Sequence, residues 1–179
     1  TEDETLEVAD FAIKQARTRE INLLLGILKA DVETMKRTIS SMIKMLQENP
    51  TGKEDAGQIL QANHDCGFTI CPPRGKSLTQ HQIEADLSAV LDMGMPIALY
   101  QLPQVTENEV APETFERLVQ KFSNLFLFKD SSGQDSVATS DIYKGGVFLV
   151  RGAEGNYAHW LTGTGGSYDG FLLSTANCF

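Results

Sequence analysis

The feature that most constrains the fold is a regular alternation between short apolar runs and longer amphipathic segments. Six runs of four to seven residues are almost continuously apolar, a pattern typical of strands that are covered on both faces. Around them, apolar residues recur at spacings of three and four, as on the buried face of a helix, and Leu6, Ala9, Ile13 and Ala16 are one such set. The six runs occupy residues 21–27, 67–71, 96–100, 125–129, 147–150 and 170–176.

This alternation predicts βα units and therefore a parallel sheet. Two architectures have this order, an open doubly wound sheet and a (β/α)8 barrel. No glycine-rich phosphate-binding motif follows any run, which disfavours the dinucleotide-binding form of the doubly wound sheet. A barrel has eight strands in about 200 residues or more, whereas the 179 residues here supply six. We therefore expect an α/β fold with a single domain over residues 1–179, a partial (β/α)8 TIM barrel that holds strands 3 to 8 and lacks the first two strands and the C-terminal helices.

Composition limits the partners and the compartment. The net charge of −9 argues against nucleic acid or an anionic membrane surface as the main partner. No segment approaches the roughly 18 consecutive apolar residues of a membrane helix. The three cysteines, an odd number, fit free thiols in a reducing compartment better than a disulfide framework, so we expect a cytoplasmic protein.

We expect reactive side chains at the carboxyl ends of the strands, because the active sites of parallel barrels lie there. The run at 125–128 is followed directly by Lys129, a charged residue that must be paired or partly desolvated beside an apolar strand. A lysine amine held neutral is a nucleophile toward carbonyl groups. Spacing alone leaves open the alternative that Lys129 simply turns outward at the strand end. The preceding run ends in Tyr100, and the following one leads into Arg151 and Gly152.

Three motifs in residues 96–177 resemble the family of dihydrodipicolinate synthase and N-acetylneuraminate lyase, the pyruvate-dependent class I aldolases. The motif YQLP (residues 100–103) matches a strand that ends in tyrosine, any residue, an apolar residue and proline. The motif KDSSG (residues 129–133) matches the segment that carries the Schiff-base lysine. A glycine followed by apolar residues at 170–173, with Ala-Asn at 176–177, matches the last strand. The earlier part of the chain matches more loosely.

The resemblance implies a mechanism and a set of site residues. Lys129 would attack the ketone of a 2-oxo acid and form an iminium ion, an electron sink for the neighbouring bond that breaks. Tyr100 would relay protons. Family positions that border the 2-oxo acid correspond to Gly152 and the backbone of Leu172, and positions that contact hydroxylated substrates correspond to Ser131 and Glu154.

The implied activity is that of a Schiff-base lyase, a class I aldolase or hydro-lyase acting on a 2-oxo acid such as pyruvate or a keto-deoxy sugar acid. No metal or organic cofactor is expected, because the lysine supplies the electrophilic catalysis. Family members are commonly homotetramers, so self-association is expected. An aldolase for a phosphorylated sugar would need phosphate contacts after the last two strands, where Arg151 is the one candidate that we find.

The chain also departs from the family pattern. Val105 stands where dihydrodipicolinate synthases place a carboxylate-binding arginine, and an apolar side chain makes no such clamp. Pro73 and Arg74 stand where the family often has two tyrosines. The family's Gly-Thr/Ser-rich carboxylate-binding loop has no counterpart in these residues. These departures motivate an alternative, a catalytically lapsed barrel that binds a small molecule.

Overall fold

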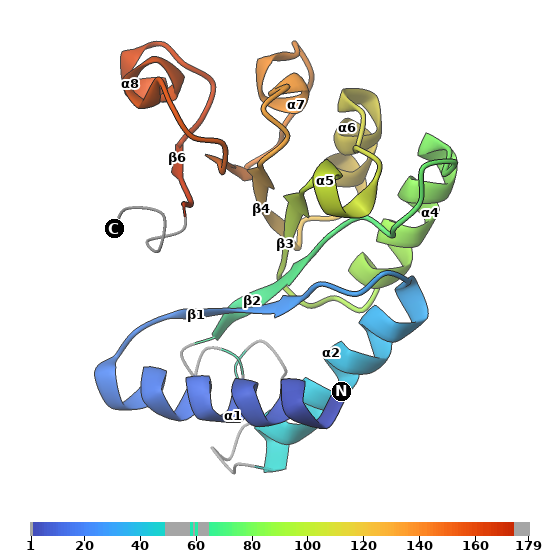
Figure 1. The fold of residues 1–179 in the computed structure, drawn as a ribbon, viewed down its shortest axis with the longest axis vertical. Helices are drawn as coiled ribbons and strands as arrows, with labels where there is room; N and C mark the ends of the chain where they lie inside the picture. Colours follow the sequence, from blue (N-terminus) through green and yellow to red (C-terminus); the bar gives the residue numbers. More distant parts are fainter. Residues whose placement is uncertain (1, 49–57, 59, 61–64, 174–179) are drawn as a thin grey trace.

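The computed structural model describes residues 2–48, 58, 60 and 65–173, and shows one parallel sheet of six strands (Figure 1). The strands follow one another in the sheet in the same order as in the sequence, and every neighbouring pair is parallel. The strands are β1 (Leu23–Ile27), β2 (Asp65–Ile70), β3 (Ile97–Gln101), β4 (Leu125–Asp130), β5 (Phe148–Arg151) and β6 (Gly170–Phe171).

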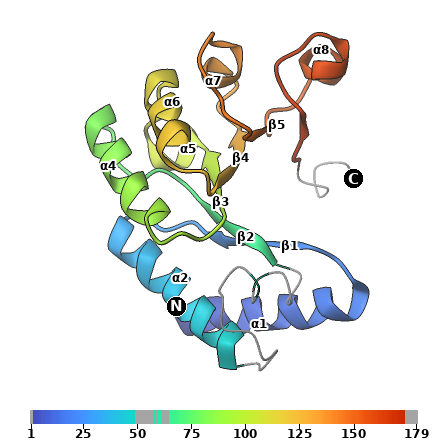
Figure 2. The same ribbon diagram turned by 180° about the vertical axis from the view of Figure 1, so that it is seen from behind.

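This sequential order decides between the two predicted architectures. A doubly wound sheet reverses its strand order at a switch point and carries helices on both faces. Here the helices form an arc along one side of the sheet, and α1 contacts α2, α2 contacts α4, α4 contacts α6 and α6 contacts α7 (Figures 1 and 2). The helices are α1 (Glu2–Arg19), α2 (Val32–Glu48), α4 (Gln80–Leu91), α5 (Pro103–Thr106), α6 (Pro112–Lys121), α7 (Ser136–Thr139) and α8 (Tyr157–Trp160).

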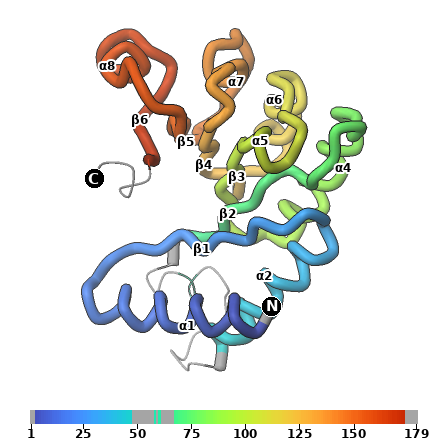
Figure 3. Tube along the Cα trace, in the orientation of Figure 1, coloured from blue at the N-terminus to red at the C-terminus, as the bar shows by residue number. Residues whose placement is uncertain are grey.

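The prediction of a partial (β/α)8 barrel is therefore confirmed. In the tube view the chain advances in one direction around a curved sheet from β1 to β6 (Figure 3). The first five strands begin and end within two residues of the predicted bounds. The last described strand is shorter than the predicted run at 170–176, of which residues 174–176 lie outside the described part, as does the Ala-Asn motif at 176–177.

Alternate residues of the strands face opposite sides of the sheet, and this alternation positions the site. One register row is buried against the helices, and the rings of Phe128 in β4 and Phe115 in α6 lie 4.9 Å apart there. That row consists of Ile27, Ile70, Leu99, Phe128 and Leu149, each less than 5% exposed. The adjacent row must then face the barrel interior.

The helices follow the predicted spacing of apolar residues. In α4, Thr79 caps the first turn, where its side chain accepts from the Gln82 backbone N–H and the Gln82 side chain accepts from the Thr79 N–H. Pro112 opens α6, where its missing N–H leaves no helical bond unmade.

No helix within the described ranges is long and apolar enough to cross a membrane.

Candidate active site

Lys129 and Tyr100 lie side by side on the interior face at the carboxyl ends of β4 and β3. They are paired in the register of the two strands, and the same row continues through Val150 to Gly170. The Lys129 Nζ lies 4.2 Å from the centroid of the Tyr100 ring. Within the described residues, the Nζ of Lys129 has no ion-pair or hydrogen-bond partner. The amine is therefore available to a ligand while an aromatic face holds it in place.

Gly152 completes the wall beside this lysine. A Cβ at position 152 would lie 2.7 Å from Lys129 Cε and would also collide with the hydroxyl of Ser131. The Gly152 N–H donates to the carbonyl oxygen of Asp130 at 2.6 Å, which fixes this close approach. A side chain at this position would push the ends of the Lys129 and Ser131 side chains aside. The structure thus brings together four of the predicted site residues, Lys129, Tyr100, Ser131 and Gly152.

Hydrogen bonds to neighbouring strands hold the segment that follows Lys129. The Ser131 N–H donates to the Gln101 carbonyl oxygen at 3.0 Å, and the Gln104 side-chain amide donates to the Ser131 carbonyl at 3.4 Å. The Ser132 N–H donates to the Asp130 carboxylate at 2.8 Å. The KDSSG segment therefore has a defined conformation across the ends of β3 and β4.

The other two predicted residues lie toward the rim. Glu154 is exposed, three residues beyond β5, and its carbonyl oxygen lies 3.5 Å from an Nη atom of Arg151. Leu172 follows β6 with 42% of its surface exposed. Its N–H donates to the Arg151 carbonyl oxygen at 3.1 Å and so continues the strand pairing. Leu172 could contact a ligand through its carbonyl oxygen and its side chain.

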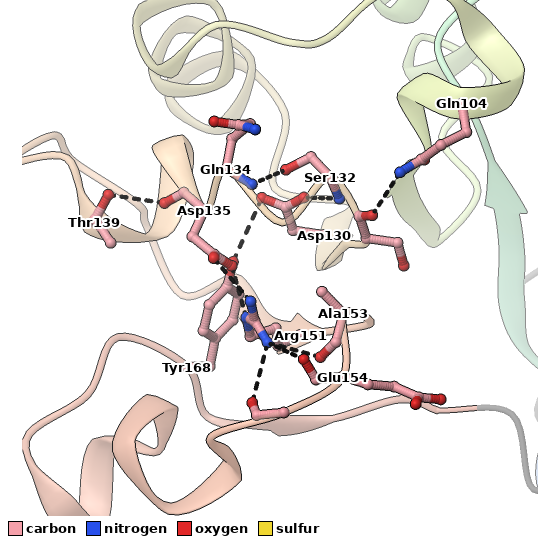
Figure 4. A network of polar contacts seen from close by, with 12 residues as sticks. Gln104, Asp130, Ser132, Gln134, Asp135, Thr139, Arg151, Ala153, Glu154 and Tyr168 are labelled. Atoms are coloured by element: carbon pink, nitrogen blue, oxygen red, sulfur yellow. Dashed lines mark hydrogen bonds and ion pairs between the residues drawn. The ribbon is translucent and has the colours of Figure 1, made fainter. Parts of the chain in front are cut away.

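A buried polar network lies on the opposite, helix-facing side of the same strand ends (Figure 4). The guanidinium of Arg151 donates to both carboxylate oxygens of Asp135, at 2.8 and 3.0 Å. The Tyr168 hydroxyl donates to Asp135 at 2.7 Å and lies 3.4 Å from Asp130. Burial raises the pKa of the Asp130 carboxyl and of the Tyr168 hydroxyl, and the hydrogen bond that Arg151 donates to Asp135 raises the pKa of Arg151. These groups join the loop after Lys129 to β5.

The network argues against Arg151 as a binding residue for the phosphate of a phosphorylated sugar. This side chain is 6% exposed, its charge is matched by Asp135, and it stacks over the Trp160 ring at 4.4 Å from the centroid. The sequence analysis did not find the network, since its members are up to 38 residues apart. The one available signal was a charged residue directly after the apolar run 147–150.

A cavity of about 230 Å³ opens at the carboxyl ends of β1, β2 and β3, and we call it the β1–β3 cavity. Its wall includes Cys71, a residue that the sequence analysis had not placed in a site. Burial raises the pKa of the Cys71 thiol to about 11, and the charge of Lys129 opposes that rise. The lining residues are Leu28, Lys29, Ala30, Cys71, Pro72, Arg74, Leu102, Val105 and Thr106.

The described residues contain no group of three or more histidine, cysteine, aspartate or glutamate side chains arranged to hold a metal ion. The groups that the site offers to a ligand include the Lys129 amine, the Tyr100 phenol and the Ser131 hydroxyl.

The solved structures that the chain resembles decide the family of folds. A dihydrodipicolinate synthase from Aquifex aeolicus superposes with a TM-score of 0.71 over 99% of this chain, at 18% identity. The chain has the fold of the dihydrodipicolinate synthases. A 2-keto 3-deoxygluconate aldolase from Picrophilus torridus matches at a TM-score of 0.67 and 19% identity, also over 99% of this chain. A prophage protein of the dihydrodipicolinic acid synthase family from E. coli K12, solved with pyruvate, matches 99% of this chain at a TM-score of 0.69 and 19% identity.

The dihydrodipicolinate synthase fold confirms, at the level of architecture, the resemblance drawn from the motifs. The chain spans about half the length of these solved structures, between 54% and 57% of each. No family model matches the sequence, and no curated protein matches it.

Proposed function

We propose that this chain carries the active site of a Schiff-base-forming lyase, a class I aldolase or hydro-lyase acting on a 2-oxo acid such as pyruvate or a keto-deoxy sugar acid. The observation that carries the proposal is the position of Lys129. Its amine projects from an interior-facing strand position beside the Tyr100 ring, 4.2 Å from the centroid, with no competing partner among the described residues. The same fold in a pyruvate-bound prophage protein supports the choice of substrate class.

The proposed chemistry uses the two side chains in sequence. The Nζ of Lys129 attacks the C2 carbonyl of the 2-oxo acid, water leaves, and an iminium ion forms. In the aldolase reaction the iminium accepts the electron pair of the C3–C4 bond as it breaks, and an enamine results. In the hydro-lyase reaction it accepts the electron pair of a C3–H bond whose proton is removed, and the enamine then expels the C4 hydroxyl, which leaves as water after protonation. The phenol of Tyr100 gives and takes the protons that these steps need. Ser131, Gly152, Glu154 and the carbonyl of Leu172 are the proposed substrate contacts.

The assignment of the six strands as strands 3 to 8 of one barrel domain over residues 1–179 is part of the same proposal. So are a homotetrameric assembly and a cytoplasmic location, which follow from the family resemblance and from the odd number of cysteines. Light scattering after size-exclusion chromatography of the full protein tests the assembly. A monomer would overturn that part alone.

Trapping of the iminium tests the function. The full protein is incubated with pyruvate and sodium borohydride, and the peptides are then mapped by mass spectrometry. A reduced pyruvate adduct on Lys129, absent from a Lys129→Arg variant and present in a Lys144→Arg control, supports the lyase. Binding of pyruvate without an adduct on a folded protein supports the alternative, a lapsed barrel that binds a small molecule.

A further inference from the structure

The β1–β3 cavity lies at the carboxyl end of β3, the strand whose Tyr100 is paired with Lys129 of β4. Cys71, in its wall, directly follows β2, and the Lys129 charge acts on the pKa of its thiol. Leu102, also in the wall, is two residues beyond Tyr100. A ligand bound to the Lys129 amine therefore has this cavity beside it for the part of the molecule that extends away from the imine.

The lining of the cavity is mainly apolar, and most of its polar groups are already paired. Six of the nine residues are aliphatic, proline or thiol side chains. The hydroxyl of Thr106 donates to the Leu102 and Asn108 carbonyl oxygens, at 3.2 and 3.0 Å. Arg74 forms an ion pair with Glu107 at 3.4 Å. A hydroxylated ligand would lose hydrogen bonds to water here and regain few of them.

Lys29 is the remaining cation of the lining, at the end of β1. It forms no ion pair with any residue that the structure describes. A partly exposed lysine can lay its methylene groups along the apolar wall while its ammonium stays in water. The Lys29 charge favours an alternative ligand, an anionic aldehyde, and the experiment below therefore includes one.

Backbone hydrogen bonds between successive loops hold the cavity open. The Arg74 N–H donates to the Ala30 carbonyl oxygen at 2.9 Å, and this bond ties the loop after β2 to the loop after β1. The Gly75 N–H donates to the Thr106 carbonyl oxygen at 2.9 Å and ties it to the segment after β3. A pocket that exists before the ligand arrives has less ordering entropy to lose on binding.

We propose that the β1–β3 cavity selects a small apolar aldehyde as the carbonyl partner of the enamine formed on Lys129. The inference rests on the proposed function and deepens it by naming the second substrate. The volume of about 230 Å³ suits a short aliphatic chain or a single aromatic ring, since pockets for drug-sized ligands hold about 300–1,000 Å³. Val105, at the position of the family's carboxylate-binding arginine, is part of the apolar wall.

The proposed reaction needs only pyruvate, the aldehyde and water. The enamine carbon, C3 of the bound pyruvate, forms a bond to the aldehyde carbon, and the aldehyde oxygen takes a proton and becomes a hydroxyl. Water then hydrolyses the iminium, releases a 4-hydroxy-2-oxo acid and restores the Lys129 amine. The reverse reaction cleaves the same bond and returns pyruvate and the aldehyde.

The test compares aldehydes of equal length with the full protein. Pyruvate is supplied with butanal, succinic semialdehyde or erythrose, all of four carbons, and with benzaldehyde, and the 4-hydroxy-2-oxo acid is measured by liquid chromatography and mass spectrometry. We expect kcat/KM for butanal or benzaldehyde to exceed that for erythrose and for succinic semialdehyde by about tenfold or more. A preference for erythrose indicates a sugar-acid enzyme, and a preference for succinic semialdehyde indicates an anion site at Lys29. Either result overturns the inference and leaves the proposed function standing.

A charged substitution in the wall provides the second measurement. Val105→Asp is expected to lower the ratio of butanal to erythrose use by about tenfold or more, because the carboxylate stays hydrated at the mouth of the cavity. Tyr143→Asp, an exposed position outside the cavity, should leave that ratio unchanged. An unchanged ratio in Val105→Asp overturns the inference. Failure to trap pyruvate on Lys129 in the wild-type protein overturns the proposed function and this inference with it.

Discussion

The ammonium of Lys129 lies over the ring of Tyr100, 4.2 Å from its centroid, and the two residues are directly paired in the register of β4 and β3. The proposed function therefore gives Tyr100 two separable roles, a ring that packs against the lysine and a phenol that moves protons. The ring orients the amine through a cation–π contact. In the proposed mechanism the hydroxyl carries the acid–base chemistry.

Tyr100→Phe separates these roles. The variant keeps the ring and loses the phenol, so we expect kcat/KM for the lyase reaction to fall about 10²–10⁴-fold, the range for loss of one general acid–base group. Borohydride trapping over long incubations should still reach Lys129. Tyr143→Phe is the control, because Tyr143 is exposed and lies with Leu125 and Val147 at the amino ends of β4 and β5. Full activity in Tyr100→Phe would show that another group moves the protons.

Gly152→Ala tests the close approach at the end of β5. The new methyl group would lie 2.7 Å from Lys129 Cε, so the lysine side chain has to move away from its position beside Tyr100. We expect the yield of trapped adduct to fall about tenfold or more, on the scale of the loss that a misplacement of about 1 Å produces. Gly146→Ala, where a Cβ would meet nothing within 4 Å, should behave as wild type. Equal trapping in both variants contradicts the geometry.

Asp135→Ala tests the buried network. The substitution leaves the guanidinium of Arg151 buried without its carboxylate, and we expect the free energy of unfolding to fall by about 3–5 kcal/mol. Urea denaturation followed by circular dichroism measures the change. The matched control is Glu84→Ala, which breaks the more exposed ion pair with Arg117 and should cost about 1 kcal/mol or less. A small effect of Asp135→Ala would show that Arg151 is not held by this pair.

The Cys71 thiol gives a pH-dependent prediction. Its pKa is raised from 9.0 to about 11, so the reactive thiolate is about a hundredfold rarer at pH 8 than for an ordinary thiol. We expect alkylation of Cys71 by iodoacetamide to be slow at pH 8 and to accelerate about tenfold per pH unit up to pH 11. Peptide mapping isolates this cysteine from the others, and the same peptide in urea is the reference. Equal rates in the folded and unfolded chain would contradict the burial of the thiol.

The raised pKa of Cys71 also determines how the free energy of unfolding changes with pH. Below pH 9 the thiol is protonated in both states, so it adds no pH dependence to unfolding. Between about pH 9 and 11 the unfolded state loses the proton and the folded state keeps it. The free energy of unfolding should therefore fall with rising pH over that window, and the fall should be smaller in Cys71→Ala.

The strands and the placement of Tyr100 and Lys129 at neighbouring strand ends were predictable because their signals are local. Continuous apolar runs mark β3 and β4, and the motifs YQLP and KDSSG end them. The short helix α5 was missed, since Pro103 was interpreted only as part of a motif and not as a helix start. The pairing of Arg151 with Asp135 and Tyr168 arises only when β5, the loop after β4 and the segment before β6 meet in three dimensions. The spacing of these residues along the sequence does not predict that they are in contact.

The β1–β3 cavity could not be predicted for the same reason. Its wall combines residues from the ends of three strands, 78 positions apart at the extremes from Leu28 to Thr106. The sequence shows that Val105 departs from the family pattern, but it does not show which residues surround this position. Val105 is part of an apolar surface because the fold brings it into the same cavity wall as Leu28 and Leu102.

The alternation within β4 makes the length of this strand more critical than its composition. Phe128 packs among the helices, Lys129 faces the interior, and Asp130 returns to the helix side. Insertion or deletion of one residue ahead of this trio would exchange the two faces, sending an amine into an apolar layer and a phenyl ring into the site. Substitutions in this strand can thus exchange one apolar side chain for another, but its length is constrained by the packing and by the proposed chemistry.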